Sequence, residues 1–214
     1  MGIAERRERE RDLQQKRRRE QILEAAKRLF HTKGFTVATV EDIAKEAELS
    51  PAAIYLYFKN KDDIYVSLNL QLLEYLSDRL EALYLEKDAG PDQKIEALKA
   101  LFHDIYNFDP LILINLFHLQ ASDGLKTLPP ERLSQLNRLA GKSLRSLARI
   151  FDQGKSEGRF APYPSIALAD IVWIMFTGAV LWEESKRMTN PDKDFLKPTL
   201  DIALDIFRRG ITTP

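Results

Sequence analysis

The sequence predicts an all-α protein with a helical N-terminal region and a larger helical bundle behind it. Apolar residues recur at helical spacing, and no stretch of useful length shows the alternation of a half-buried strand. With 44% apolar and 30% charged residues, the 214-residue chain has enough apolar side chains to bury a core. We therefore expect two domains, residues 1–61 and residues 62–214.

Composition also excludes several kinds of protein. The chain has no cysteine, which rules out disulfide scaffolds and thiolate metal sites. No stretch without charge, residues 171–182 included, reaches the roughly 20 residues that a helix needs to cross a bilayer. The N-terminus alternates glutamate and arginine with no apolar run after it. We therefore expect no secretory signal, no membrane contact and a cytoplasmic location.

The first expected helix ends near Gly34 and has one apolar stripe. No proline or glycine interrupts residues 4–33, and five side chains recur there at helical spacing: Ile22, Ala25, Ala26, Leu29 and Phe30. Gly34 suits the C-terminal stop, because glycine reaches left-handed dihedral angles without a Cβ clash. Residues 4–15 have charges on every face, so the sequence leaves open whether they extend this helix or fray.

Two short helices are expected next, each with a side chain that can cap its first turn. Thr39 can cap one, with Asp42 three residues on as in a capping box. Ser50 can cap the other, Pro51 suits its first position, and the pattern continues to about Phe58. Two short helices joined by a turn behind a longer packing helix make a helix-turn-helix, whose last helix enters the major groove of DNA. The pattern therefore predicts a three-helix DNA-binding domain.

Proline, glycine and polar breaks delimit the other expected helices: 62–87, 92–108, 110–122, 130–156, 165–188 and 194–209. Residues 165–187 are apolar on nearly every face, so this helix must be covered all round. We expect a second copy of the chain to cover it, through a two-fold interface formed by residues 165–187 and 194–209. The alternative is a single central core helix within one chain.

A set of N-terminal residues agrees in order and spacing with one known family: Ile22–Phe30, Gly34–Phe35, Thr39–Ala44, Ala47, Leu49–Ser50, Ile54–Phe58 and Lys61. Over about residues 18–65 the chain thus resembles TetR/AcrR-type transcriptional regulators. The resemblance implies a homodimer that binds palindromic operator DNA and usually represses until a small molecule binds the larger helical domain. Glu48 and Ala52 stand where the family often has glycine. Glu48 raises the question of whether the turn needs a positive φ.

Three groups of residues are expected at the DNA. By resemblance, four hold phosphate-contacting positions: Thr39, Tyr55, Tyr57 and Lys61. For the two tyrosines the alternative is core packing. A second group begins the first helix beside the flanking backbone, where its cations would add affinity on any sequence: Arg17, Arg18 and Arg19.

The third group forms the first turn of the recognition helix and is expected to meet base edges: Ser50, Pro51, Ala52 and Ala53. None has a long hydrogen-bonding arm, which favours thymine-methyl contacts by alanine, a hydroxyl contact by Ser50 and shape readout. The alternative is that these small residues only allow close approach, while Lys45 or the N-terminal arm reads the bases.

In this family the helical bundle encloses the effector, and eight residues are candidates to line its site: Leu68, Leu72, Tyr75, Phe102, His103, Tyr106, Phe117 and His118. From sequence alone, such residues are more often plain core. The expected effector is a small, largely apolar molecule. His103 and His118 stand far apart in the chain without a short metal-binding spacing, so no metal site and no cofactor are expected.

Motifs for catalysis are missing from the sequence. It has no glycine-rich phosphate loop, Gly-x-Ser-x-Gly elbow, cysteine nucleophile or His-Glu-x-x-His pair, so we do not expect an enzyme. The expected function is a dimeric, ligand-responsive DNA-binding regulator, in most such cases a repressor. The alternative is a DNA-bound structural or interaction protein with no small-molecule ligand.

Overall fold

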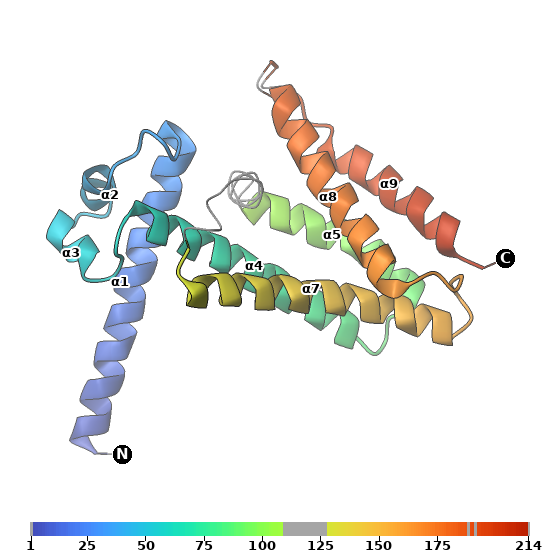
Figure 1. Cartoon of the computed structure of the whole chain (residues 1–214), viewed down its shortest axis with the longest axis horizontal. Helices are drawn as coiled ribbons and strands as arrows, with labels where there is room; N and C mark the ends of the chain where they lie inside the picture. Colours follow the sequence, from blue (N-terminus) through green and yellow to red (C-terminus); the bar gives the residue numbers. More distant parts are fainter. Residues whose placement is uncertain (1, 109–127, 188, 191, 214) are drawn as a thin grey trace. The chain divides into compact units, whose positions relative to one another are not determined.

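The structure of the protein is a computed structural model that describes residues 2–108, 128–187, 189–190 and 192–213. Within these residues the chain forms helices and no strand, which confirms the all-α prediction (Figure 1). The helices are α1 (Ile3–Lys33), α2 (Val40–Glu46), α3 (Pro51–Tyr55), α4 (Lys61–Leu85), α5 (Pro91–Phe108), α7 (Pro130–Ser156), α8 (Ser165–Arg187) and α9 (Leu196–Ile211). The helix expected at 110–122 lies outside the described residues.

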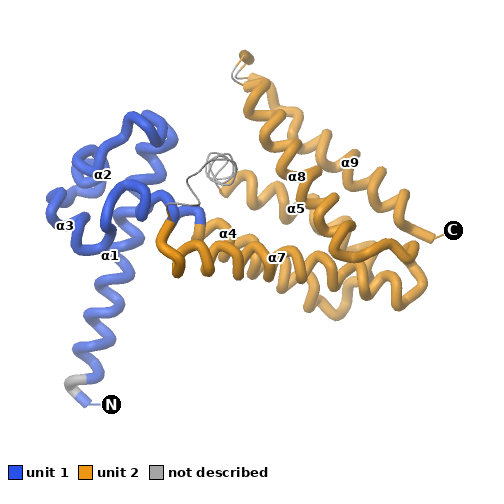
Figure 2. The backbone as a smooth tube through the Cα atoms, viewed as in Figure 1, with its two compact units in different colours: residues 1–69 blue, residues 70–214 orange. Residues whose placement is uncertain are grey.

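The chain divides into two compact units, Met1–Asn69 and Leu70–Pro214 (Figure 2). The expected boundary after residue 61 is displaced toward the C-terminus, because the first two turns of α4 pack within unit 1. Ile64 there is fully buried, and the Tyr65 ring lies with its centroid 4.5 Å from that of Phe35. α4 is therefore a single helix that begins in unit 1 and continues into unit 2.

Unit 1 is formed by α1, α2, α3 and the start of α4. The stripe predicted on α1 is buried, and α1 packs on α2, which packs on α3. Gly34 ends α1 with φ of 80°, as its sequence position predicts. The sequence left open whether residues 4–15 extend the first helix or fray. In the structure they extend it, and residues 5–15 form helical turns with exposed side chains.

Unit 2 is a bundle in which α8 packs on α7 and α9, and α5 packs on α7 and α9. Its core includes the Phe102 and Phe176 rings, stacked with centroids 4.4 Å apart. The ring of Phe160 closes the end of α7 so tightly that a Cβ placed on Gly154 would lie 2.0 Å from it. Because the breaks in the sequence are true helix ends, the predicted bounds hold within two residues for the described helices of this unit.

Candidate DNA-binding site and effector cavity

The start of α2 is fixed by a complete capping box. Thr39 Oγ1 accepts a hydrogen bond from the Asp42 N–H at 3.1 Å, and Asp42 Oδ2 accepts one from the Thr39 N–H at 3.2 Å. Lys33 Nζ at the end of α1 lies 2.9 Å from Asp42 Oδ1. The hydrogen bond from Lys33, followed by those from Thr39, holds the pKa of Asp42 below its usual value of 3.8. This one carboxylate therefore joins the last turn of α1 to the first turn of α2.

The turn after α2 does need a positive φ at Glu48. Among the described residues Glu48 is the one non-glycine with a positive φ, at 54°. The turn closes with the Leu49 N–H donating to Ala44 O at 2.8 Å, a backbone bond that brings the chain back over the end of α2. The left-handed conformation costs an L-residue with a Cβ about 1–2 kcal/mol. Glu48 therefore holds a strained position for which glycine is better suited.

The recognition helix α3 begins as predicted but is short. Ser50 Oγ accepts from the Ala53 N–H at 3.2 Å, and Pro51 takes the first helical position. The regular helix ends at Tyr55, before the predicted limit near Phe58, because two successive N–H groups, of Tyr57 and Phe58, share the Ile54 carbonyl. Ile54 and Phe58 are buried and anchor the helix to its unit.

The predicted contact residues of the helix-turn-helix are largely exposed. Tyr55 is 53% exposed and Tyr57 is half-buried, so one tyrosine is free and the other shares in packing. The other predicted residues with exposed side chains are Thr39, Ser50, Pro51 and Ala52, and Ala53 is half-buried. Although the oxygens of Thr39 and Ser50 accept capping bonds, each hydroxyl hydrogen stays available to donate.

Three long polar side chains hold the short helices in place, and sequence analysis did not assign them this role. Gln21 Nε2 donates to Ala47 O at 2.7 Å at the end of α2, and Arg19 Nη1 donates to Tyr57 O at 3.1 Å after α3. Lys61 Nζ donates to carbonyls of the loop between α1 and α2. Helix ends leave carbonyls without intrahelical partners, so Gln21 and Arg19 satisfy groups that the two very short helices cannot satisfy themselves. Lys61 does the same for carbonyls of the loop before α2.

Two of the predicted phosphate contacts are thus engaged inside unit 1. Arg19 also donates to Ser67 Oγ at 2.8 Å, and its guanidinium lies 4.2 Å from the centre of the Phe58 ring. The three donors of Lys61 meet three carbonyl oxygens, of Phe35, Thr36 and Ala38. Either side chain would have to break these bonds to reach a phosphate.

Arg17 and Arg18 differ from Arg19 in their surroundings. Arg17 is exposed, and Arg18 donates to Gln21 Oε1 at 2.9 Å on the same helix. Helical spacing sets Arg17 apart from the other two, because Arg18 and Arg19 precede Ile22 by four and three residues and therefore lie toward the buried stripe. The spacing does not distinguish Arg18 from Arg19. The phosphate role of Arg17 and Arg18 stays a prediction.

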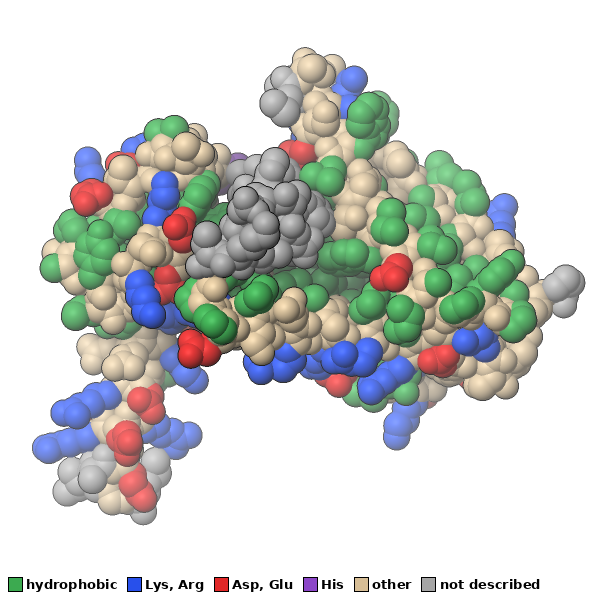
Figure 3. Space-filling view, in the orientation of Figure 1, with side chains coloured by type: hydrophobic (Ala, Val, Ile, Leu, Met, Phe, Trp, Pro, Cys, Tyr) green, Lys and Arg blue, Asp and Glu red, His purple; other side chains and the backbone are tan. Residues whose placement is uncertain are grey.

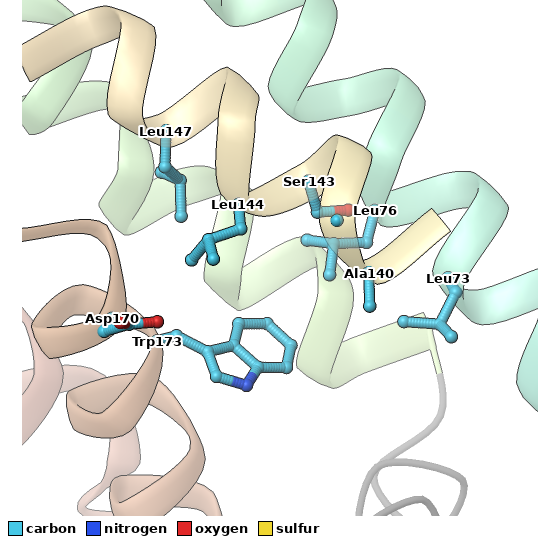
Figure 4. Close-up of a pocket in the computed structure, with 9 residues that line it drawn as sticks. Leu73, Leu76, Ala140, Ser143, Leu144, Leu147, Asp170 and Trp173 are labelled. Atoms are coloured by element: carbon cyan, nitrogen blue, oxygen red, sulfur yellow. The ribbon is translucent and has the colours of Figure 1, made fainter. Parts of the chain in front are cut away.

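Unit 2 contains a cavity of about 210 Å³ between α4, α7 and α8 (Figure 4). Its described lining residues are Leu73, Leu76, Ala140, Gly141, Ser143, Leu144, Leu147, Asp170 and Trp173. The small residues at 140, 141 and 143 create the space on the α7 side, where larger side chains would fill it. Beyond the cavity, Lys142 on α7 pairs with Glu81 on α4 at 2.6 Å and joins the two walls.

None of the predicted ligand residues within the described range lines this particular cavity. Four are buried in the cores of their units: Leu68, Leu72, Phe102 and Tyr106. Tyr75 stacks on Phe108 with ring centroids 5.1 Å apart, and His103 is half-buried. Burial, and then a hydrogen bond from its hydroxyl to the Glu184 carboxylate, raises the pKa of Tyr106 above its usual range. Phe117 and His118 lie outside the described residues, and the ligand role of all eight stays a prediction.

In the described part of the chain, α8 and α9 carry exposed apolar side chains, called here the apolar face: Ile171, Ile174, Leu181, Trp182, Ile202 and Ile206. Ile174, Trp182 and Ile206 are each about two-thirds exposed. Hydrophobic side chains gather over this part of the molecule in Figure 3. α8 is also long and apolar enough to span a membrane by length and composition, and 39% of its most apolar window is buried within the chain. Leu200 and Leu204 of α9 point the other way and are buried in the core.

Comparison with known proteins agrees with this geometry. Residues 22–68 match the family model for bacterial regulatory proteins of the tetR family. The HTH-type transcriptional repressor NicS of Pseudomonas putida is 28% identical over 144 residues, which are 67% of this chain and 66% of that relative. The structure of the TetR family regulator PfmR from Thermus thermophilus has a TM-score of 0.72 at 23% identity, over 88% of this chain and 97% of that one.

A further solved structure contains a ligand. FadR from Bacillus subtilis, in complex with stearoyl-CoA, has a TM-score of 0.67 at 24% identity, over 90% of this chain and 98% of that one. Such likenesses extend the shared fold over both units.

The capped α2–turn–α3 arrangement in unit 1, followed by a separate helical bundle, defines a helix-turn-helix transcriptional regulator. With the family match over residues 22–68, the similarity to a transcriptional repressor over 67% of the chain and the fold shared over 88% of it, the protein is a TetR/AcrR-type transcriptional regulator.

Proposed function

We propose that the protein is a dimeric, cytoplasmic repressor that binds a palindromic operator and leaves it when a small, largely apolar effector binds in unit 2. The observation that supports this best is the exposed first turn of α3, held from behind by buried Ile54 and Phe58. A rigid helix end that offers only small side chains is suited to close approach in the major groove. Its alanine methyl groups favour thymine, whose C5-methyl group lies in that groove.

The apolar face supports the dimer. Exposed apolar residues are normal when they are scattered, but a contiguous stripe along two packed helices marks an interaction site. On α8 the stripe follows helical spacing through Ile171, Ile174 and Leu181, with Gly178 between them to let a partner helix approach. A two-fold interface brings the same stripe from both copies together. The dimer then presents two copies of α3 to operator half-sites about 34–36 Å apart.

The cavity in unit 2 supports the effector. Most of its lining is apolar, and two of its lining residues, Leu73 and Leu76, belong to α4, the helix that begins in unit 1. A ligand that moves α4 therefore acts on an element that both units share. Effector and operator affinities must then be reciprocally coupled, typically by about 1–3 kcal/mol. The stearoyl-CoA complex of the Bacillus subtilis relative is consistent with an effector that has an apolar part.

Selection of bound fragments from genomic DNA tests the operator part of the proposal. The wild-type protein is expected to enrich fragments that share an inverted repeat, whose neighbouring genes then indicate the effector class. Enrichment of unrelated fragments would contradict sequence-specific regulation.

The mass of the protein in solution tests the dimer. Light scattering should give two copies per particle for the wild type and one copy for Ile174→Glu, which places a charge in the middle of the apolar face. Ser134→Glu, which adds the same charge at an exposed position on α7, should remain dimeric. A monomeric wild type at micromolar concentration would exclude the proposed two-fold arrangement.

A further inference from the structure

The cavity in unit 2 combines a mainly apolar wall with a single charged group among its described lining residues. Leucines of α4 and α7 and the Trp173 ring supply the apolar surface, and the polar side chains are Ser143 and Asp170. In Figure 4, Asp170 and Trp173 extend from α8 toward the α7 wall. Since these two residues are three apart on one helix, they lie on the same face and act on the same part of a ligand.

The polar groups of the cavity favour a positively charged ligand. Ser143 Oγ donates its hydrogen to Leu139 O at 3.0 Å, so its free capacity is as an acceptor. Asp170 is exposed, and no hydrogen bond or ion pair to it occurs within the described part of the chain. The Arg145 side chain passes beside Gly141 but is exposed and does not line the cavity. Among the described residues that line the cavity, the Asp170 carboxylate beside the Trp173 ring therefore has no cationic side chain to pair with.

We infer that the effector is an apolar amine or related organic cation, with its charged nitrogen at Asp170 and Trp173 and its apolar part against the leucines. This inference rests on the proposed function, because it names the chemical class of the effector for the same cavity. The ion pair with Asp170 and the attraction of a cation to the Trp173 ring act together. A carboxylate or phosphate ligand would instead meet the negative charge of Asp170.

The volume of the cavity limits the size of the apolar part. A dry protein cavity of roughly 150 Å³ is large enough for benzene. The cavity of about 210 Å³ therefore has room for one aromatic ring and a short alkyl chain, although it is small for a long acyl chain. The predicted ligand thus differs in charge and in length from the stearoyl-CoA bound to the Bacillus subtilis relative.

Three probes with the same phenylpropyl skeleton test the inference: 3-phenylpropylamine, 3-phenylpropan-1-ol and 3-phenylpropanoate. Titration calorimetry at neutral pH and low salt should show that the amine binds the full-length protein about 5- to 20-fold more tightly than the alcohol. The carboxylate should bind more weakly than the alcohol. Ala140→Phe, which fills the cavity, should weaken both the amine and the alcohol.

Two matched substitutions separate the role of Asp170 from a general loss of negative charge. Asp170→Asn should reduce the affinity of the amine to that of the alcohol and leave the alcohol unchanged. Glu74→Gln removes an exposed carboxylate from α4, outside the cavity lining, and should preserve the preference for the amine. Thermal unfolding of each variant confirms that it is folded before it is titrated.

The inference is overturned if the alcohol or the carboxylate binds as tightly as the amine, if none of the three binds, or if Asp170→Asn keeps the preference. Operator binding, measured by fluorescence anisotropy on the same preparations, distinguishes this failure from failure of the proposed function. Intact operator binding with no preference for the amine rejects only the effector class. Loss of sequence-specific DNA binding by the wild type rejects the proposed function itself.

Discussion

The two units of this protein hold their helices together by different means. In unit 1, α2 and α3 have seven and five residues, too few to bury a wide apolar face, and side chains of Arg19, Gln21 and Lys61 donate to their ends or to the loop before them. In unit 2, α7 and α8 are 27 and 23 residues long and pack through apolar stripes. A polar side chain near a short helix can therefore stabilise the fold as much as a core side chain does in a bundle of long helices.

The apolar bundle of unit 2 should show the largest response to overpacking. Gly154→Ala places a methyl group within 2.0 Å of the Phe160 ring, so the ring must move and the end of α7 must open. We expect the free energy of unfolding to fall by about 3 kcal/mol. Gly210→Ala is the control, because its Cβ meets nothing within 4 Å. Urea unfolding monitored by circular dichroism measures the stability of both variants. Similar midpoints for the two would contradict the tight packing of Phe160 against Gly154.

The capping network of unit 1 should respond nearly as strongly to loss of a polar side chain. Arg19→Ala removes the bonds to Tyr57 O and Ser67 Oγ, and we expect a loss of about 2 kcal/mol of unfolding free energy. Arg17→Ala is the control, because Arg17 is exposed and lies only two residues away. It should change the free energy of unfolding by less than about 0.5 kcal/mol.

Arg17→Ala and Arg19→Ala should also differ in their effect on DNA binding. Arg17→Ala should lower the slope of log K against log salt by about one, because one phosphate contact is lost. Measured at a temperature where it is folded, Arg19→Ala should keep the wild-type slope. A lowered slope for Arg19→Ala, with wild-type stability, would show that its guanidinium contacts DNA instead of the unit 1 backbone.

The strained turn between α2 and α3 should give a smaller effect of opposite sign. Glu48→Gly relieves a positive φ of 54°, and after the greater chain entropy of glycine is subtracted we expect a gain of about 0.5–1 kcal/mol. Glu24→Gly, at an exposed position inside α1, should instead cost about 1 kcal/mol. Denaturation midpoints of the two variants that shift in the same direction would argue against strain at Glu48.

The dependence on pH should be the most modest effect and should come from Asp42 in unit 1. Its pKa is lowered in the folded protein, so its contribution to stability is fully present above the usual value of 3.8 and is lost as the pH falls through the folded value. Asp42→Asn should therefore be less stable than the wild type at pH 7, and the difference should shrink below about pH 4. Urea midpoints of the two proteins measured from pH 7 to pH 3 test this, and a difference that stays constant to pH 3 would contradict it.

Local chemistry explains which parts of the structure could be predicted from the sequence. The helix starts at Thr39, Ser50 and Pro51 and the helix end at Gly34 are predictable, because each of these residues favours a particular conformation or hydrogen bond of the backbone close to it. The roles of Arg19 and Lys61 depend on carbonyls 38 and 26 residues away in the chain, so only the folded unit reveals them.

The lining of the cavity could not be predicted from the sequence for a related reason. α4 has apolar residues on most sides, and its helical spacing does not show which of them will face the bundle. Leu72 and Leu73 are adjacent in sequence and point about 100° apart on a helix. Leu72 is buried in the core and Leu73 lines the cavity. The space itself depends on small residues of α7, which have no distinctive pattern in the sequence.

In the proposed complex α3, exposed at its first turn and anchored by its buried side, reads DNA as one of a symmetric pair. A nuclease footprint on a selected genomic fragment shows whether it does. We predict two protected half-sites related by an inverted repeat, with centres roughly 10 base pairs apart, and loss of both with Ala52→Glu, which should keep the wild-type melting temperature. A single asymmetric footprint, or an unchanged footprint with the folded Ala52→Glu variant, would show that α3 does not read DNA as one of a pair.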